Sequence, residues 1–140
     1  MKNENVKKGI IFPLGKENVA YAKDFIAKSY LEPLVNDPKV NVSVSNVTFE
    51  PGCRNNWHKH HNGFQILLVT GGEGWYQEAG KPARLLKPGD VVVTHNDVKH
   101  WHGATKNSWF SHIAITAGKA IWLEPVTDKQ YEEVAKGANK

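Results

Sequence analysis

The chain has 140 residues, 40% of them hydrophobic and 10% aromatic, which predicts one folded domain and excludes a disordered chain. The formal net charge is +4, and the lysines are scattered without a nucleic-acid reader motif, so we expect no nucleic-acid partner. Apolar runs are too short for a membrane span, and residues 1–13 lack a secretory apolar region. Cys53 is the single cysteine, which excludes an internal disulfide and favours a cytoplasmic location.

The first predicted elements form an N-terminal arm over residues 1–39, with an edge strand between Phe25 and Val35. From residue 40 onward, turn residues recur about every eight to twelve positions, as in a β-sandwich or barrel. Within residues 42–49 the apolar alternation shifts by one position, which predicts a β-bulge.

The central predicted strand, residues 64–70, is nearly continuous in apolar side chains and should be buried on both faces. Glycines at 71–74 interrupt it. The strands expected after this break are 75–77, 83–86, 91–94 and 109–116, the last ending at Gly118. Together these strands predict an all-β barrel over residues 40–117.

The C-terminal extension, residues 118–140, should carry a short helix and belong to the same structural domain. Thr127 and Gln130 have the spacing of a capping box, and Gly137 follows the apolar positions. The predicted fold class is therefore all-β, with one short C-terminal helix.

All seven histidines lie between His58 and His112. His58 and His60 flank one residue, so they share a strand face and could bind one metal ion side by side. An isolated pair of this kind is more often an ordinary part of a strand. Gln65 and His100 each lie in a glycine-containing motif, and their presence makes a metal site the favoured interpretation.

Two more histidines are candidates for acid–base catalysis. His102 shares the strand face of His100 by alternation. His112 alternates with Ala114 and Thr116, small or polar positions that could line a pocket beside the metal. These residues alone do not decide which of the two histidines is the base.

The other conspicuous side chains have ordinary interpretations. His61 and His95 fall in predicted loops and should be exposed, and Cys53 has no evident base to activate it. Barrel packing and the pocket wall are the expected roles of four tryptophans, with an aromatic substrate cage as the alternative: Trp57, Trp75, Trp101 and Trp109.

The histidine motifs resemble the two signatures of the cupin family. Gly52-x5-His58-x-His60-x4-Gln65-x6-Gly72 is similar to the first, with glutamine where glutamate is usual. The segment 89–100 is similar to the second, with His95 and Asp97 where that family has proline and glycine. The resemblance implies a small β-barrel, a double-sheet jelly roll, with a metal in its mouth.

A narrower resemblance rests on residues 47–52, 87–92, 99–104 and 111–115, which are similar to single-domain manganese-dependent hydroxynitrile lyases. That group overlaps with the carboxymuconolactone decarboxylase-like cupins. By position, the resemblance implies that the metal ligands are His58, His60, Gln65 and His100, and it favours His112 as the base. The x4 gap is one residue longer than in the lyases, so the ligand loop should bulge.

The implied ligands are neutral, so a bound dication would keep its full charge and act as a Lewis acid. Manganese is the expected metal, and iron, zinc, nickel or copper are compatible. The leading expectation is a lyase that cleaves a C–C bond of a small hydroxylated substrate. An Fe(II)-dependent dioxygenase and a non-catalytic binding or sensing cupin are the alternatives. An exposed edge strand suggests a homodimer or higher homo-oligomer.

Overall fold

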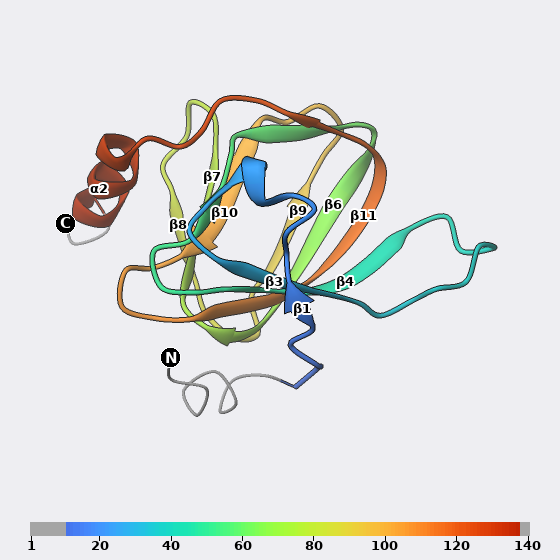
Figure 1. Ribbon diagram of the computed structural model, residues 1–140. Coiled ribbons are helices and arrows are strands. Elements are labelled where there is room, and N and C mark those ends of the chain that lie inside the picture. The colour runs from blue at the N-terminus through green and yellow to red at the C-terminus, as the bar shows by residue number, and fades with distance from the viewer. Residues whose placement is uncertain (1–10, 138–140) are drawn as a thin grey trace.

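The computed structural model describes residues 11–137 and has a curled antiparallel sheet with one α-helix (Figure 1). The elements, in chain order, are β1 (Lys16–Glu17), η1 (Ala22–Asp24), β2 (Phe25–Ile26), β3 (Ser29–Pro33), β4 (Ser43–Phe49), β5 (Arg54–Asn55), β6 (His58–Gly72), β7 (Gly74–Glu78), β8 (Arg84–Leu86), β9 (Val91–Thr94), β10 (His100–Ala104), β11 (Phe110–Trp122) and α2 (Asp128–Gly137). The strand order is β1-β3-β4-β11-β6-β10-β5-β2, with β7 on β10, β8 on β7 and β9 on β6. This arrangement confirms the predicted all-β barrel.

Strand β6 lies between β11 and β10 and carries one face into the barrel. Leu67 and Val69 are buried there, whereas Ile66 and Leu68 on the opposite face are only half-buried. The prediction that this strand is buried on both faces is therefore wrong. One side of this strand lines the interior, and the other forms part of the outer surface.

Strand β4 pairs with β3 and β11 without a register shift, so the bulge predicted within residues 42–49 is absent. Its apolar pattern shifts because two polar side chains are buried. The Asn46 amide donates to the carbonyl oxygen of Pro13, and the Thr48 hydroxyl lies 2.8 Å from the Ser111 hydroxyl. Hydrogen bonding satisfies these groups in place.

The N-terminal arm runs across the barrel rather than along one edge (Figure 1). The predicted edge strand divides into β2, which pairs with β5, and β3, which lies between β1 and β4. Strand β11 also differs from the prediction. It passes through Gly118 and continues to Trp122, where it pairs with His58.

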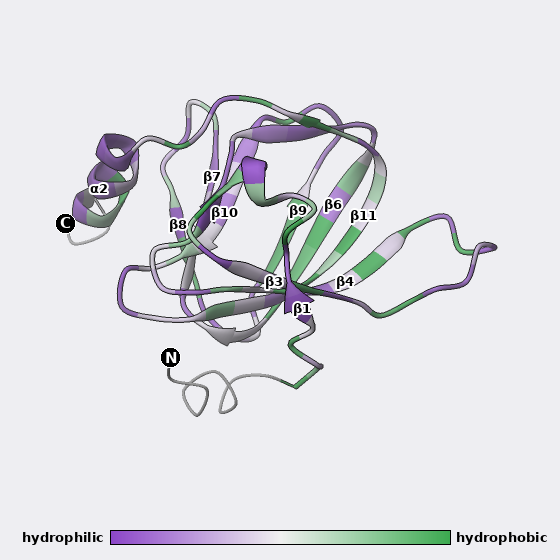
Figure 2. Cartoon of the chain, viewed as in Figure 1, coloured by the Kyte–Doolittle hydropathy of each residue, from purple (hydrophilic) through white to green (hydrophobic). Residues whose placement is uncertain are grey.

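A second apolar cluster lies between the sheet and α2, outside the barrel interior. Its buried members are Trp57, Trp75, Trp101, Val126 and Tyr131. The predicted capping box is present, because the Gln130 backbone N–H donates to Thr127 Oγ1 and the Thr127 N–H donates to Gln130 Oε1. Figure 2 shows that α2 is mostly hydrophilic, whereas β6, β9 and β11 carry the more hydrophobic stretches.

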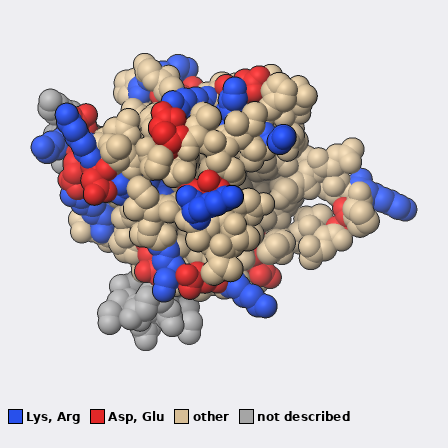
Figure 3. All heavy atoms as spheres, turned by 45° about the horizontal axis from the view of Figure 1, so that its top comes forward, with Lys and Arg blue, Asp and Glu red and all other residues tan. Residues whose placement is uncertain are grey.

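Lysine and arginine side chains are interspersed with acidic ones on the face seen in Figure 3. That face carries no continuous basic surface of the kind used to bind nucleic acid. Within residues 11–137, no helix has the length and apolar character needed to cross a membrane.

Candidate metal centre

Three histidine rings converge where β6 meets β10. The two strands pair at His58 and His100, whose ring centroids are 4.2 Å apart. The His60 ring is 5.2 Å from that of His58 and 5.3 Å from that of His100. All three side chains are buried. The structure thus brings the predicted histidine ligands together.

Gln65 joins this group because of a β-bulge. It is five positions after His60, so regular alternation would place the two side chains on opposite faces. Opposite Gly118 of β11, β6 has two residues, Asn62 and Gly63, and the register shifts there. The extra residue restores the parity, and Gln65 becomes buried on the histidine side. The expected bulge in the ligand loop is present.

The hydrogen bonds leave the histidine ring nitrogens suited to a metal ion. His58 Nδ1 lies 2.8 Å from the Asn56 carbonyl oxygen, and His100 Nδ1 lies 3.0 Å from that of Val98. A ring nitrogen facing a carbonyl oxygen must carry the hydrogen, so Nε2 of each ring has a free lone pair. Both nitrogens of His60 are buried without a hydrogen-bond partner.

Gln65 supplies the clearest test of whether a cation fits. Its Nε2 donates to Thr116 Oγ1 at 3.0 Å, which aims its Oε1 at His100 Nε2, 3.2 Å away. In this orientation the Gln65 oxygen and the His100 Nε2 lone pair are adjacent, so one cation can bind both. If His100 instead carried its hydrogen on Nε2, its Nδ1 lone pair would face the Val98 carbonyl oxygen. The donor set therefore fits a metal ion.

Burial keeps these imidazoles neutral. Desolvation lowers the pKa of His100 to about 4 and the pKa of His58 well below its usual value; the neighbouring imidazoles add to the effect. The pKa of His60 is also lowered, mainly by burial. Neutral imidazole is the form that binds a metal.

His102 and His112 form a second, directly bonded pair beside this set. His112 Nε2 is 3.1 Å from His102 Nδ1, and the His102 Nε2 is 3.2 Å from the Asn55 amide nitrogen. Burial holds the pKa of His112 at about 3 and that of His102 well below its usual value. The donor atoms of His58, His100 and His102 lie within 4.8 Å of one another, a group that does not include His60. Both nitrogens of His102 already have partners, so it suits the ligand role less well.

Members of both groups line one cavity of about 320 Å³: His58, His60, Gln65, His102 and His112. Ala114 and Thr116 line it too, as the alternation with His112 predicts. Sequence reasoning missed Trp122, whose ring lies 4.5 Å from the His58 ring at a tilt, and it missed Tyr21 and Phe25 of the N-terminal arm, which pack beside Trp122. These three aromatic side chains form the cavity wall nearest the arm.

The remaining residues singled out by sequence lie away from the cavity. His61 and His95 are exposed, and His61 Nδ1 is 3.0 Å from the Asp97 carboxylate. Burial raises the pKa of the Cys53 thiol to about 12, which makes it a poor nucleophile. None of the four tryptophans named from sequence lines the cavity; three pack under α2, and Trp109 stacks on Tyr30.

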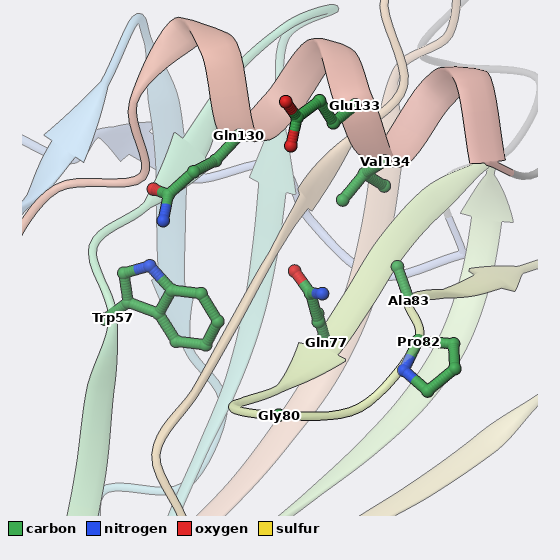
Figure 4. Close-up of a pocket in the computed structure, with 8 residues that line it drawn as sticks. All are labelled: Trp57, Gln77, Gly80, Pro82, Ala83, Gln130, Glu133 and Val134. Atoms are coloured by element: carbon green, nitrogen blue, oxygen red, sulfur yellow. The ribbon is translucent and has the colours of Figure 1, made fainter.

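A second pocket of about 450 Å³ lies between α2 and the turn joining β7 to β8 (Figure 4). Trp57 and Gln77 form its floor, and Gln130, Glu133 and Val134 of the helix lie above them. It contains none of the histidines and is separate from the candidate metal centre.

Family comparison agrees with this geometry. Residues 45–123 match the model of the cupin domain. The chain is a cupin. It is 45% identical over 106 residues to a protein of Granulicella tundricola named (R)-mandelonitrile lyase, covering 72% of this chain and 80% of that one.

Two solved cupin-fold structures extend the comparison. A cupin-like protein from Thermotoga maritima is 43% identical, with a TM-score of 0.83 over 89% of this chain and 96% of that one. A predicted oxalate decarboxylase from the same organism is 22% identical, with a TM-score of 0.63 over 69% of this chain and 86% of that one. The second likeness supports the fold alone.

Proposed function

We propose that this cupin is a metal-dependent lyase that cleaves a C–C bond of a small hydroxylated substrate, of which a cyanohydrin is the model case. The observation that carries the proposal is the shared cavity, in which a neutral donor set lies beside a neutral histidine pair. The name of the Granulicella tundricola relative supports the same reaction class.

In this proposal the cation is held by His58, His60, Gln65 and His100, and the ion is manganese. When bound, the dication would supply Lewis-acid polarisation of a substrate oxygen. Because imidazole and amide ligands are neutral, they would not offset its charge.

The His102–His112 pair would take the proton of the substrate hydroxyl. Both rings are neutral at pH 7, since burial lowers the pKa of each. As the O–H bond breaks, its electron pair forms the second bond of an aldehyde C=O, and the C–C electron pair leaves with cyanide. The imidazolium then returns the proton to give hydrogen cyanide. General-base help of this kind contributes about 10²–10⁴-fold in rate.

The test is cleavage of mandelonitrile by manganese-loaded protein, followed through the absorbance of benzaldehyde. We expect the wild type and His61→Ala to cleave it, because His61 is exposed and outside the cavity. His58→Ala should lose both bound metal and cleavage. A manganese-loaded wild type that leaves a panel of cyanohydrins intact would refute the lyase, and oxygen consumption by the iron-loaded protein would point to a dioxygenase.

We also propose that two copies associate through the outer face of β6, β9 and β11. Val91 and Val93 are 54% and 47% exposed, and they pair in register with Leu68 and Ile66. Like β1, β2 and β8, β9 has one paired neighbour among the strands within residues 11–137. Contiguous apolar surface of this kind is typical of interfaces. Sedimentation should find a dimer that Val93→Lys weakens; a wild-type monomer at micromolar concentration would contradict this.

A further inference from the structure

Asn55 of β5 holds the His102 side chain and backbone at once. Its Oδ1 accepts the His102 backbone N–H at 2.9 Å, and its Nδ2 lies 3.2 Å from Nε2 and 3.5 Å from Nδ1 of the ring. Both residues are buried and line the cavity. A backbone N–H can only donate, so the amide oxygen must face it and the amide NH₂ must face the ring.

The orientation of this amide determines the His102 tautomer. Its NH₂ group can only donate, so the nearer ring nitrogen, Nε2, must carry a lone pair. A neutral imidazole has one hydrogen, which therefore lies on Nδ1 and is donated to His112 Nε2, 3.1 Å away. The opposite tautomer would set the ring N–H against the Asn55 NH₂ and leave two buried donors unpaired, whereas the assigned tautomer leaves one, the His112 Nδ1 hydrogen.

We propose that Asn55 is a positioning residue that fixes His102 as the proton acceptor, with its lone pair on Nε2, and places His112 behind it as the group that accepts the Nδ1 hydrogen. A substrate hydroxyl at this wall of the cavity would compete with the amide for that lone pair. The same bond occupies the lone pair that would otherwise bind a cation and so keeps His102 apart from the ligands. The catalytic meaning of this assignment rests on the proposed function, whereas the tautomer does not.

The direct test is nitrogen NMR of protein labelled with ¹⁵N in its histidine rings, recorded on the metal-free and the zinc-loaded forms. The chemical shifts distinguish protonated, free and metal-bound ring nitrogens. In the wild type we expect the His102 hydrogen on Nδ1, with Nε2 neither protonated nor bound to zinc. In Asn55→Asp the carboxylate can only accept, so Nε2 should gain a hydrogen.

Asn18→Asp is the matched control. Asn18 is also buried and lines the same cavity, but its amide donates to Ser29 Oγ at 3.2 Å. The His102 signals should be unchanged in this variant. If Asn55→Asp does not fold, Asn55→Ala serves instead, and it should replace the single tautomer with a mixture or allow zinc to bind Nε2.

Either of two results would overturn the assignment: a wild-type His102 with its hydrogen on Nε2, or the wild-type tautomer retained in the folded Asn55 variants. If the lyase proposal holds, Asn55→Asp should also lower kcat by on the order of 10²–10⁴-fold. A protein with the expected tautomers but no lyase activity would refute the proposed function and leave the role of Asn55 in fixing the tautomer intact.

Discussion

Thr116→Val should weaken metal binding without touching any proposed ligand. The Thr116 hydroxyl accepts the Gln65 amide hydrogen at 3.0 Å, which keeps Gln65 Oε1 turned toward His100 Nε2. Valine has the same shape but no acceptor, so the amide can rotate and present its NH₂ group to the cation. Loss of a hydrogen bond that orients a ligand typically lowers metal affinity by about 10–100-fold. That range corresponds to about 1.4–2.7 kcal/mol of binding free energy.

The measurement is competition for Zn(II) between the protein and a chromophoric chelator at pH 7. Thr116→Ser keeps the hydroxyl and should keep the affinity. Thr70→Val is the matched control, because Thr70 is on the same strand as Gln65 and its hydroxyl donates to the Ser111 carbonyl oxygen instead. If folded Thr116→Val and the wild type have equal Kd values, the amide orientation of Gln65 does not matter and the reasoning fails.

Three further predictions concern stability and reactivity. Arg54→Ala should lower the free energy of unfolding, measured in urea, by about 3 kcal/mol, because the buried guanidinium makes two hydrogen bonds to the Val126 carbonyl oxygen. Its ion-pair partner Asp128 has a side chain that is 93% exposed, so Asp128→Ala should lower the same quantity by under about 1 kcal/mol. Burial raises the pKa of Cys53 to about 12, so a thiol reagent at pH 8 should react only after unfolding. The contribution of the neutral thiol to stability should be lost as pH rises from about 9 toward 12. Cys53→Ala should therefore show a flatter dependence of the free energy of unfolding on pH. Gly63→Ala should reduce stability by at least about 1–3 kcal/mol in the same urea assay, because its Cβ would lie 2.0 Å from a backbone oxygen of β11.

The strands and the shared face of His58 and His60 were predictable because each depends on local alternation. His58 and His60 share a face by strand geometry alone, and turn residues separate most of the strands. Gln65 was not predictable in this way, since its odd spacing from His60 indicates the opposite face. Its position depends on the bulge at Asn62, whose φ of 60° lies in the left-handed region that asparagine tolerates.

The rest of the site was not predictable because it depends on contacts between distant segments. Asn55 lies against His102 through the pairing of β5 with β10 at Arg54 and Gly103. Gly103 permits this approach, since a Cβ there would lie 2.5 Å from a backbone oxygen of Cys53. Trp122 reaches the cavity only because β11 extends past Gly118, which resembles a strand end in the sequence but continues the strand at the bulge.

The charge of the cavity connects these features to the proposed chemistry. Its lining residues include four of the histidines and Gln65 but no aspartate or glutamate, and His100 lies directly against Gln65. Burial lowers the pKa of every histidine in this group, so none of them carries charge at pH 7. A dication in such a lining would have no carboxylate among its neighbours in the cavity, so a negative charge could reach it directly only by entering the cavity. A substrate becomes anionic when it gives up a proton to His102, so it would supply this negative charge. A neutral glutamine therefore suits a reaction that begins by deprotonating a hydroxyl group better than a carboxylate would.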